Sequence, residues 1–330
     1  MVAQLDKQYV ALRPTRAVSR LISYGLFEGR PLTTRGRWIN PALKVAGRAI
    51  MRLPKMGSVV KPIFILGTGR SGTTILGKTL SLHRDIGYLN EGKLPWHLAY
   101  PFEDLNGNYT NQLAHYRLDE SSASPAVTMK IHKIYGAYLA LTRNHRLLEK
   151  YPELIFRIPF VQTIFPDARF IILVRNGNDT VKSIVSWSDQ HGQDGDEHTI
   201  DWWGKDDRKW HLLAEQLVTQ DPELALHSNE IAAFSSHANR AAVEWLLTMK
   251  SGLKLVSDQP ESALQVKYED LAGDPSGELK RIMRFCELQD DPYVTDYGQM
   301  AIEPRPPRDA VELNSVIEGP FQFMMNRLGY

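Results

Sequence analysis

The residues best suited to chemistry form a glycine-rich loop at positions 67–74, with the sequence GTGRSGTT. The loop follows a short apolar run, residues 63–66, and its end opens a stretch with helical apolar spacing, residues 71–83. Backbone N–H groups at the start of a helix bind phosphate oxygens, and arginine and hydroxyl side chains strengthen such a site. The predicted phosphate-binding residues are Gly69, Arg70, Ser71, Gly72, Thr73 and Thr74.

The loop differs in two respects from that of proteins that bind nucleoside triphosphates. Gly67 and Gly72 have the P-loop spacing, but Thr73 stands where the P-loop carries its lysine. A second apolar run, residues 170–174, ends in Arg175 and not in the aspartate that would hold Mg²⁺. Arginines in these positions, without a carboxylate for a metal, favour an anion that binds without metal. The sequence therefore predicts no metal site.

Three stretches resemble the sulfotransferases that use 3′-phosphoadenosine-5′-phosphosulfate (PAPS), especially the branch of bacterial carbohydrate-type and tyrosylprotein sulfotransferases. They are PIFILGTGRSGTT at 62–74, FPDARFIILVR at 165–175 and VKYEDL at 266–271. The first two together are specific to the family, whereas the third alone is weak. The resemblance covers roughly residues 60–290. It implies PAPS as the donor, 3′-phosphoadenosine-5′-phosphate (PAP) as a product, and no metal requirement.

The resemblance assigns two further parts of the donor site. Arg175 and Ser183 are eight positions apart, the separation at which this family places an arginine and a serine on the 3′-phosphate. A strand-end arginine and a serine two turns into the next helix would converge beside the first loop. The alternative is that Arg175 pairs with Asp179 and that Ser183 is a buried helix hydroxyl. By resemblance, Tyr268 lies near the adenine.

Sulfuryl transfer requires a general base for the acceptor proton and cations for the sulfuryl and bridging oxygens. By resemblance the base is Glu91, twenty-one residues after Arg70, where the tyrosylprotein branch carries its catalytic glutamate. A carboxylate suits this task if partial burial raises its pKa toward neutrality. His132, in the segment MKIHK, is the alternative base. The predicted cations are Arg70 and, by resemblance, Lys150.

An α/β fold must position these residues, with a mostly parallel central sheet flanked by helices. Buried apolar runs that alternate with helical spacing are typical of parallel strands joined by crossover helices. The resemblance implies the P-loop-type sulfotransferase fold. The predicted strands are residues 63–66, 169–174 and 263–268, and the predicted helices are residues 71–83, 135–149, 153–165, 175–187, 238–249 and 276–288.

Two polar, aromatic segments, near residues 89–125 and 189–210, are predicted to be loop-rich insertions of the acceptor site. The second is rich in tryptophan and is expected to form a lid. Their side chains can stack on rings and hydrogen-bond to hydroxyls. We expect the acceptor to be a hydroxyl, less readily an amine, on a glycan, a glycolipid or a small molecule.

Residues 1–61 form a basic arm in front of a sulfotransferase domain at residues 62–330. The arm holds twelve Lys or Arg residues and only two acidic ones, among short apolar groups. We expect a helical arm whose apolar side packs on the domain; the alternative is peripheral contact with an anionic membrane. No aromatic-studded basic module follows, so nucleic-acid binding is not expected.

The single cysteine, Cys286, excludes an internal disulfide and predicts a buried thiol in a reducing compartment. No apolar stretch reaches the ~20 residues of a bilayer span, and no signal peptide is apparent. We expect a cytoplasmic protein, associated with the cytosolic membrane face where the arm binds lipid. The competing functions are a P-loop small-molecule kinase that uses ATP and Mg²⁺, and a non-enzymatic protein that binds a membrane surface.

Overall fold

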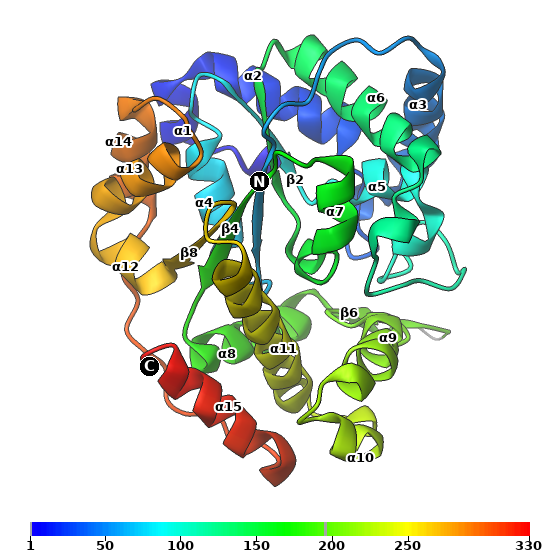
Figure 1. Cartoon of the computed structure of the whole chain (residues 1–330), viewed down its shortest axis with the longest axis vertical. Helices are drawn as coiled ribbons and strands as arrows, with labels where there is room; N and C mark the ends of the chain where they lie inside the picture. The colour runs from blue at the N-terminus through cyan, green and yellow to red at the C-terminus, as the bar shows by residue number, and fades with distance from the viewer. Residues whose placement is uncertain (1, 195–196) are drawn as a thin grey trace.

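The computed structural model describes residues 2–194 and 197–330. Its centre is a sheet of five parallel strands in the order β2-β3-β1-β4-β8 (Figure 1). After β1 the chain forms β2 and β3 on one side of it and then β4 and β8 on the other, so the strand order reverses beside β1. Ligands of open α/β sheets bind at the carboxyl ends of strands at such a point. The strands are Ile63–Gly67 (β1), Ile86–Asn90 (β2), Arg146–Lys150 (β3), Arg169–Val174 (β4) and Ala263–Lys267 (β8).

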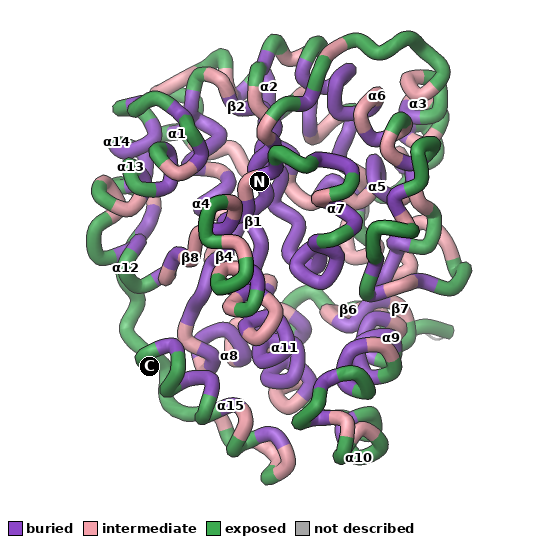
Figure 2. The backbone as a smooth tube through the Cα atoms, viewed as in Figure 1, coloured by how far each residue is buried: buried purple, intermediate pink, exposed green. Residues whose placement is uncertain are grey.

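Side chains of β1 alternate between two hydrophobic cores, one on each face of the sheet. Phe64 and Leu66 belong to the larger core, whereas Ile63 and Ile65 belong to the smaller. Both sets are fully buried, as expected for a parallel sheet that helices cover on both faces (Figure 2). The larger core includes residues of α6 (Pro125–Thr142), α7 (Ile158–Ile164), α8 (Gly177–His191), α9 (Arg208–Gln216), α11 (His237–Asp258) and α15 (Ser315–Arg327).

The second face is covered by helices from both ends of the chain. Its core includes residues of α1 (Lys7–Leu12), α2 (Pro14–Ile22), α4 (Thr73–Leu80), α12 (Tyr268–Gly273), α13 (Pro275–Phe285) and α14 (Pro292–Ala301). Cys286 lies in this core and is fully buried, which confirms the predicted core thiol. The remaining α-helices are α3 (Asn40–Arg52), α5 (Lys93–Ala99) and α10 (Ser228–Ala232).

The arm is attached to the domain by ion pairs as well as by apolar contacts. Arg13 binds Asp291 at 2.7 Å, and Lys78 of α4 binds Asp6 at 2.6 Å. Two short turns, η2 (Ser23–Phe27) and η3 (Arg35–Ile39), connect α2 to α3. α3 packs against α5 and α6. Residues 28–34, between the two turns, run toward the carboxyl edge of the sheet and line the cavity described below.

The predicted strands at β1, β4 and β8 are confirmed, and so is the mostly parallel sheet. The predicted helix at residues 135–149 is wrong in its second half, where β3 lies. The helix there is α6, which begins ten residues earlier at Pro125, with the Ser124 hydroxyl as its N-cap. Residues 89–125 also hold more regular structure than predicted, because they begin at the end of β2 and contain α5.

The predicted lid segment, residues 189–210, forms a small antiparallel sheet. Its strands are β5 (Gln193–Asp194), β6 (Thr199–Asp201) and β7 (Gly204–Lys205). Residues 195 and 196 of this segment lie outside the described part of the chain. The segment ends in α9, whose residues Trp210 and Leu213 are fully buried.

Candidate active site

A cavity of about 880 Å³ lies at the carboxyl edge of the central sheet. Residues at or just after the end of each of the five strands line it. These residues are Gly69 after β1, Glu91 after β2, Lys150 at the end of β3, Arg175 after β4 and Tyr268 after β8. The structure therefore brings the two predicted halves of the site, donor loop and base, into one cavity.

The loop after β1 has several residues with positive φ, a backbone conformation that favours glycine. Gly67 and Gly72 have φ values of 144° and 101°, and Arg70 also has a positive φ, 71°. A Cβ on Gly72 would come within 2.5 Å of the Tyr268 ring. The Ser71 hydroxyl is buried and has no hydrogen-bond partner among the described residues. A buried, unsatisfied hydroxyl at the start of α4 suits a bound phosphate oxygen.

Arg70 and Arg175 face each other across the donor end of the cavity. Arg70 Nε donates to the Ser183 hydroxyl at 3.3 Å, and an Arg175 guanidinium N–H donates to the Arg70 carbonyl at 3.2 Å. Burial and the nearby positive charges of Arg175 and Arg305 lower the pKa of Arg70. Three like charges held together with partial burial make a site that favours an anion.

The alternative partner of Arg175, Asp179, is also present. Its carboxylate lies 3.6 Å from the guanidinium, a long ion pair, while the Arg175 Nε is buried without a hydrogen-bond partner in the described chain. Arg175 also stacks on the ring of Tyr268 at 4.6 Å. Arg175 and Ser183 both line the cavity, so the pairing with Asp179 does not withdraw the arginine from it.

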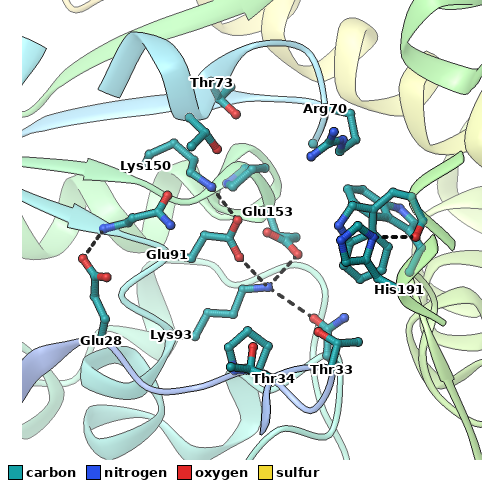
Figure 3. Close-up of a pocket in the computed structure, with 18 of the residues that line it drawn as sticks. Glu28, Thr33, Thr34, Arg70, Thr73, Glu91, Lys93, Lys150, Glu153 and His191 are labelled. Carbon is teal, nitrogen blue, oxygen red and sulfur yellow. Dashed lines mark hydrogen bonds and ion pairs between the residues drawn. The ribbon is translucent and has the colours of Figure 1, made fainter. Parts of the chain in front are cut away.

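Glu91 and Lys150 form a close ion pair on the other side of the cavity. Lys150 Nζ donates to Glu91 Oε1 at 2.5 Å, and Lys93 lies 3.6 Å from the second Glu91 oxygen (Figure 3). Lys93 also binds Glu153 at 3.1 Å. The Glu91 backbone has a φ of 55° and its N–H donates to the Lys150 carbonyl at 2.7 Å, which fixes the turn after β2.

This network changes the expected ionisation of Glu91. Burial alone would raise the pKa of Glu91, but the charges of Lys150 and Lys93 outweigh it and lower the pKa to about 2. The condition of a pKa raised toward neutrality is therefore not met in this structure. Burial lowers the pKa of Lys93, but attraction to Glu153 and Glu91 outweighs it, so that pKa is raised. Glu91, Lys93 and Glu153 are therefore charged at neutral pH.

His132, the alternative base, lies away from this network. Its Nε2 is 3.0 Å from the Ile164 carbonyl, and its ring packs 4.8 Å from that of Phe165. It is not among the described residues that line the cavity. The structure thus brings Glu91, but not His132, to the predicted reaction site.

The basic arm supplies one wall of the cavity, which the sequence did not indicate. Glu28 accepts a hydrogen bond from the Asn90 N–H at 2.7 Å, directly before Glu91, and Thr33 and Thr34 face the cavity nearby (Figure 3). Glu28 is the only acidic residue between Asp6 and Asp85. An isolated carboxylate in such a basic segment could have indicated that Glu28 is a buried ion-pair partner, as it is of Arg20.

An aromatic wall forms the opposite side. The Trp187 ring stacks on His191 at 5.1 Å and meets Trp202 edge-on at 5.4 Å. The Trp202 indole N–H donates to Glu244 at 2.7 Å, and Glu244 pairs with Lys209 at 2.6 Å. The wall thus joins α8, the small antiparallel sheet and α11, and its aromatic faces and charged groups border the cavity.

No group of three or more His, Cys, Asp or Glu side chains is arranged to hold a metal ion within residues 2–194 and 197–330. In the same part of the chain no helix is long and apolar enough to cross a bilayer.

Comparison with known proteins shows the family. Residues 62–231 match the model described as the sulfotransferase family, which is half of the chain, and the chain belongs to this family of enzymes. The family resemblance noted in the sequence is confirmed.

Individual relatives are distant. A curated protein of Caenorhabditis briggsae, named "Putative protein-tyrosine sulfotransferase", is 23% identical over 228 residues, 69% of this chain. The match spans 65% of that protein's length, slightly less than two thirds. The sulfotransferase STF1 from Mycobacterium tuberculosis H37Rv has a TM-score of 0.49 and 13% identity, with 98% of this chain and 93% of that chain covered. The sulfotransferase domain of the Synechococcus PCC 7002 olefin synthase has a TM-score of 0.48 and 16% identity, with 84% and 97% covered.

Proposed function

We propose that this protein transfers a sulfuryl group from PAPS to a hydroxyl group of its acceptor. The observation that carries the proposal is the division of one cavity into two chemically different halves. Arg70, Arg175 and Arg305 surround the loop end, which suits a ligand with phosphates at two positions. Glu91 and Lys150 supply a carboxylate and a cation at the other end.

In this proposal the two halves act on one in-line displacement. The acceptor oxygen forms a bond to sulfur while the bond from sulfur to the bridging phosphate oxygen breaks, and PAP leaves. Glu91 accepts the acceptor's proton. Lys150 moves from Glu91 to the bridging oxygen, where it stabilises the negative charge that develops on the leaving phosphate. Arg70 and the loop N–H groups hold the 5′-phosphate, while Arg175 and Ser183 hold the 3′-phosphate.

The aromatic wall and the neighbouring amide side chains favour a sugar as the acceptor. Trp187 and Trp202 offer flat apolar faces on which a sugar ring can stack, and Asn106 and Asn108 line the same cavity. An amide side chain both donates and accepts hydrogen bonds, as sugar hydroxyls do. We infer that the acceptor is a hydroxyl of a glycan or glycolipid, in preference to a flat phenol.

Titration calorimetry with PAP and with ATP plus Mg²⁺ tests the donor half. We expect PAP to bind without metal and Arg175→Ala to abolish that binding, because the variant loses a buried cation at the 3′-phosphate. Arg284→Ala, at an exposed position of α13, is the control and should bind PAP normally. Binding of ATP with Mg²⁺ and no binding of PAP would instead indicate a kinase.

Replacement of Glu91 by glutamine tests the base. Glu91→Gln should bind PAP as the wild type does, because the side chain lies across the cavity from the loop. Transfer of labelled sulfate from PAPS to a panel of glycans should fall by about 10²–10⁴, the usual contribution of a general base. Unchanged turnover would assign the proton transfer to another group.

A further inference from the structure

The outer face of α3 forms a continuous stripe along the helix. Residues 41, 42, 45, 48, 49 and 52 are exposed. At 3.6 residues per turn these positions fall on one side of an α-helix. The opposite side, with Leu43 and Gly47, is buried where α3 packs on α5 and α6. Figure 1 shows α3 at the edge of the molecule, beside α6.

Large apolar side chains are concentrated on and around this stripe. Trp38, in the turn just before α3, is 79% exposed, and Val45 is 65% exposed. Leu53 and Met56, just after the helix, are exposed as well. Single exposed apolar residues are common on protein surfaces, but four within nineteen residues, on α3 and at its two ends, indicate an interaction surface.

The same face is strongly basic. Arg37, Arg48, Arg52 and Lys55 are exposed, and none of them forms an ion pair within the described residues. The sequence contains no Asp or Glu from residue 29 to residue 84. The neighbouring helices α5 and α6 contain no acidic residue either. We call the exposed residues 37–56 the α3 face; its positive charge has no acidic counterpart on the elements packed beside it.

We propose that the α3 face docks on the surface of an anionic lipid bilayer. An interfacial helix places its cations at the level of the lipid phosphates and its apolar side chains at the boundary of the acyl chains, and tryptophan is favoured at that depth. In a two-fold symmetric dimer, a second copy of this chain would meet the face with the same positive charge. A nucleic acid would pair with the arginines but leave Val45, Leu53 and Met56 without a partner.

Docking through this face has a consequence for the acceptor. Thr33 and Thr34 line the cavity, and η3 with Trp38 follows directly. A bilayer against the α3 face therefore lies next to the cavity wall that the arm builds. Resting on the proposed transferase function, this arrangement favours an acceptor whose sugar is attached to a lipid.

Vesicle flotation with the full chain, in the absence of donor and acceptor, tests docking independently of catalysis. We expect binding to vesicles of phosphatidylcholine mixed with phosphatidylserine, weaker binding at high salt, and little binding to phosphatidylcholine alone. Each basic residue near such a surface contributes about a fivefold gain in affinity. The double variant Arg48→Gln, Arg52→Gln should therefore bind about 30-fold more weakly.

A matched control is available on α13. Lys280 and Arg284 are exposed and four residues apart, as Arg48 and Arg52 are. Figure 1 shows α13 on the opposite side of the molecule from α3. The variant Lys280→Gln, Arg284→Gln loses the same charge and should bind vesicles as the wild type does. Equal weakening in both double variants would show non-specific attraction and overturn the proposal.

Trp38 reports directly on insertion. Brominated lipids quench tryptophan emission only at short range, and four of the other six tryptophans, Trp96, Trp203, Trp210 and Trp245, are fully buried. We expect quenching by vesicles that contain such lipids and its loss in Trp38→Phe. Unquenched emission in bound wild type would exclude docking through this face. Dimerisation that Trp38→Ala abolishes, or tighter binding to DNA than to vesicles, would overturn the proposal in favour of those partners. Normal PAP binding in every variant would establish that it is folded.

Discussion

The ion pair between Arg20 and Glu28 connects the arm to the cavity, and its loss should be costly. The two side chains are only 4% and 5% exposed and lie 2.6 Å apart. Arg20 also donates to the Ser23 hydroxyl at 2.7 Å and to the Tyr88 carbonyl at 3.0 Å. In Arg20→Met the Glu28 carboxylate stays buried and keeps the Asn90 N–H as a donor. Breaking a buried pair by removing one partner costs about 3–5 kcal/mol, so we expect a loss of that size.

A double-mutant cycle measured by urea unfolding checks this value. Arg20→Met and Glu28→Met should each destabilise the protein, but the double variant should recover at least ~1 kcal/mol of their summed loss, because no unpaired charge remains buried. Lys254→Met removes an exposed pair with Asp258 and should cost less than ~1 kcal/mol. A loss below ~1 kcal/mol in Arg20→Met, or strictly additive effects, would refute the coupling.

Two further predictions follow from buried titratable groups. Burial raises the pKa of Glu149 from 4.5 to about 8, against hydrogen bonds from Tyr135 and Trp96. The folded carboxyl then keeps a proton that the unfolded chain has lost, so the free energy of unfolding should fall as the pH rises through this interval. Urea denaturation measured across this pH range should show a smaller decrease in the free energy of unfolding for Glu149→Gln than for the wild type. An identical pH dependence in the two proteins would contradict the raised pKa of Glu149. Burial also raises the pKa of Cys286 to about 12, so its thiol should react with an aromatic disulfide reagent only on unfolding, and rapid reaction of the folded protein would count against this.

The strands that the sequence predicts correctly are those in which the residue types themselves indicate burial. β1 and β4 lie in the middle of the sheet and are buried on both faces, so every position is apolar except the first residue of β4. The pattern at β3 does not indicate a buried strand, because β3 carries three charged residues, Arg146, Glu149 and Lys150. Glu149 is buried there because Trp96 and Tyr135 donate hydrogen bonds to it. These partners lie far from it in the sequence, and no local pattern indicates them.

The candidate site shows the same division. The loop and Arg175 follow central strands, so their positions relative to one another could be predicted from a short motif and the sheet topology. Arg305 and the arm residues around Glu28 reach the cavity only through the folding of distant segments. The arm's composition predicts a helical segment that packs on the domain or contacts a membrane, and it does not indicate that residues 28–34 are part of the cavity wall. The overall composition of a segment does not show which of its residues reach a site, and Glu28 is an acidic residue in an otherwise basic arm.

The low pKa of Glu91 is consistent with its proposed role as a base once the movement of Lys150 is considered. A carboxylate with a pKa of about 2 is ionised at neutral pH, as a base must be at the start, but it is too weak to accept a proton readily. In the proposed mechanism Lys150 moves to the donor's bridging oxygen and its attraction to Glu91 weakens, so that burial then raises the pKa of Glu91. Lys93, at 3.6 Å and paired with Glu153, retains only part of the opposing charge effect. We therefore propose that proton acceptance by Glu91 is coupled to the presence of the donor, so that the base becomes effective only when there is a sulfuryl group to transfer.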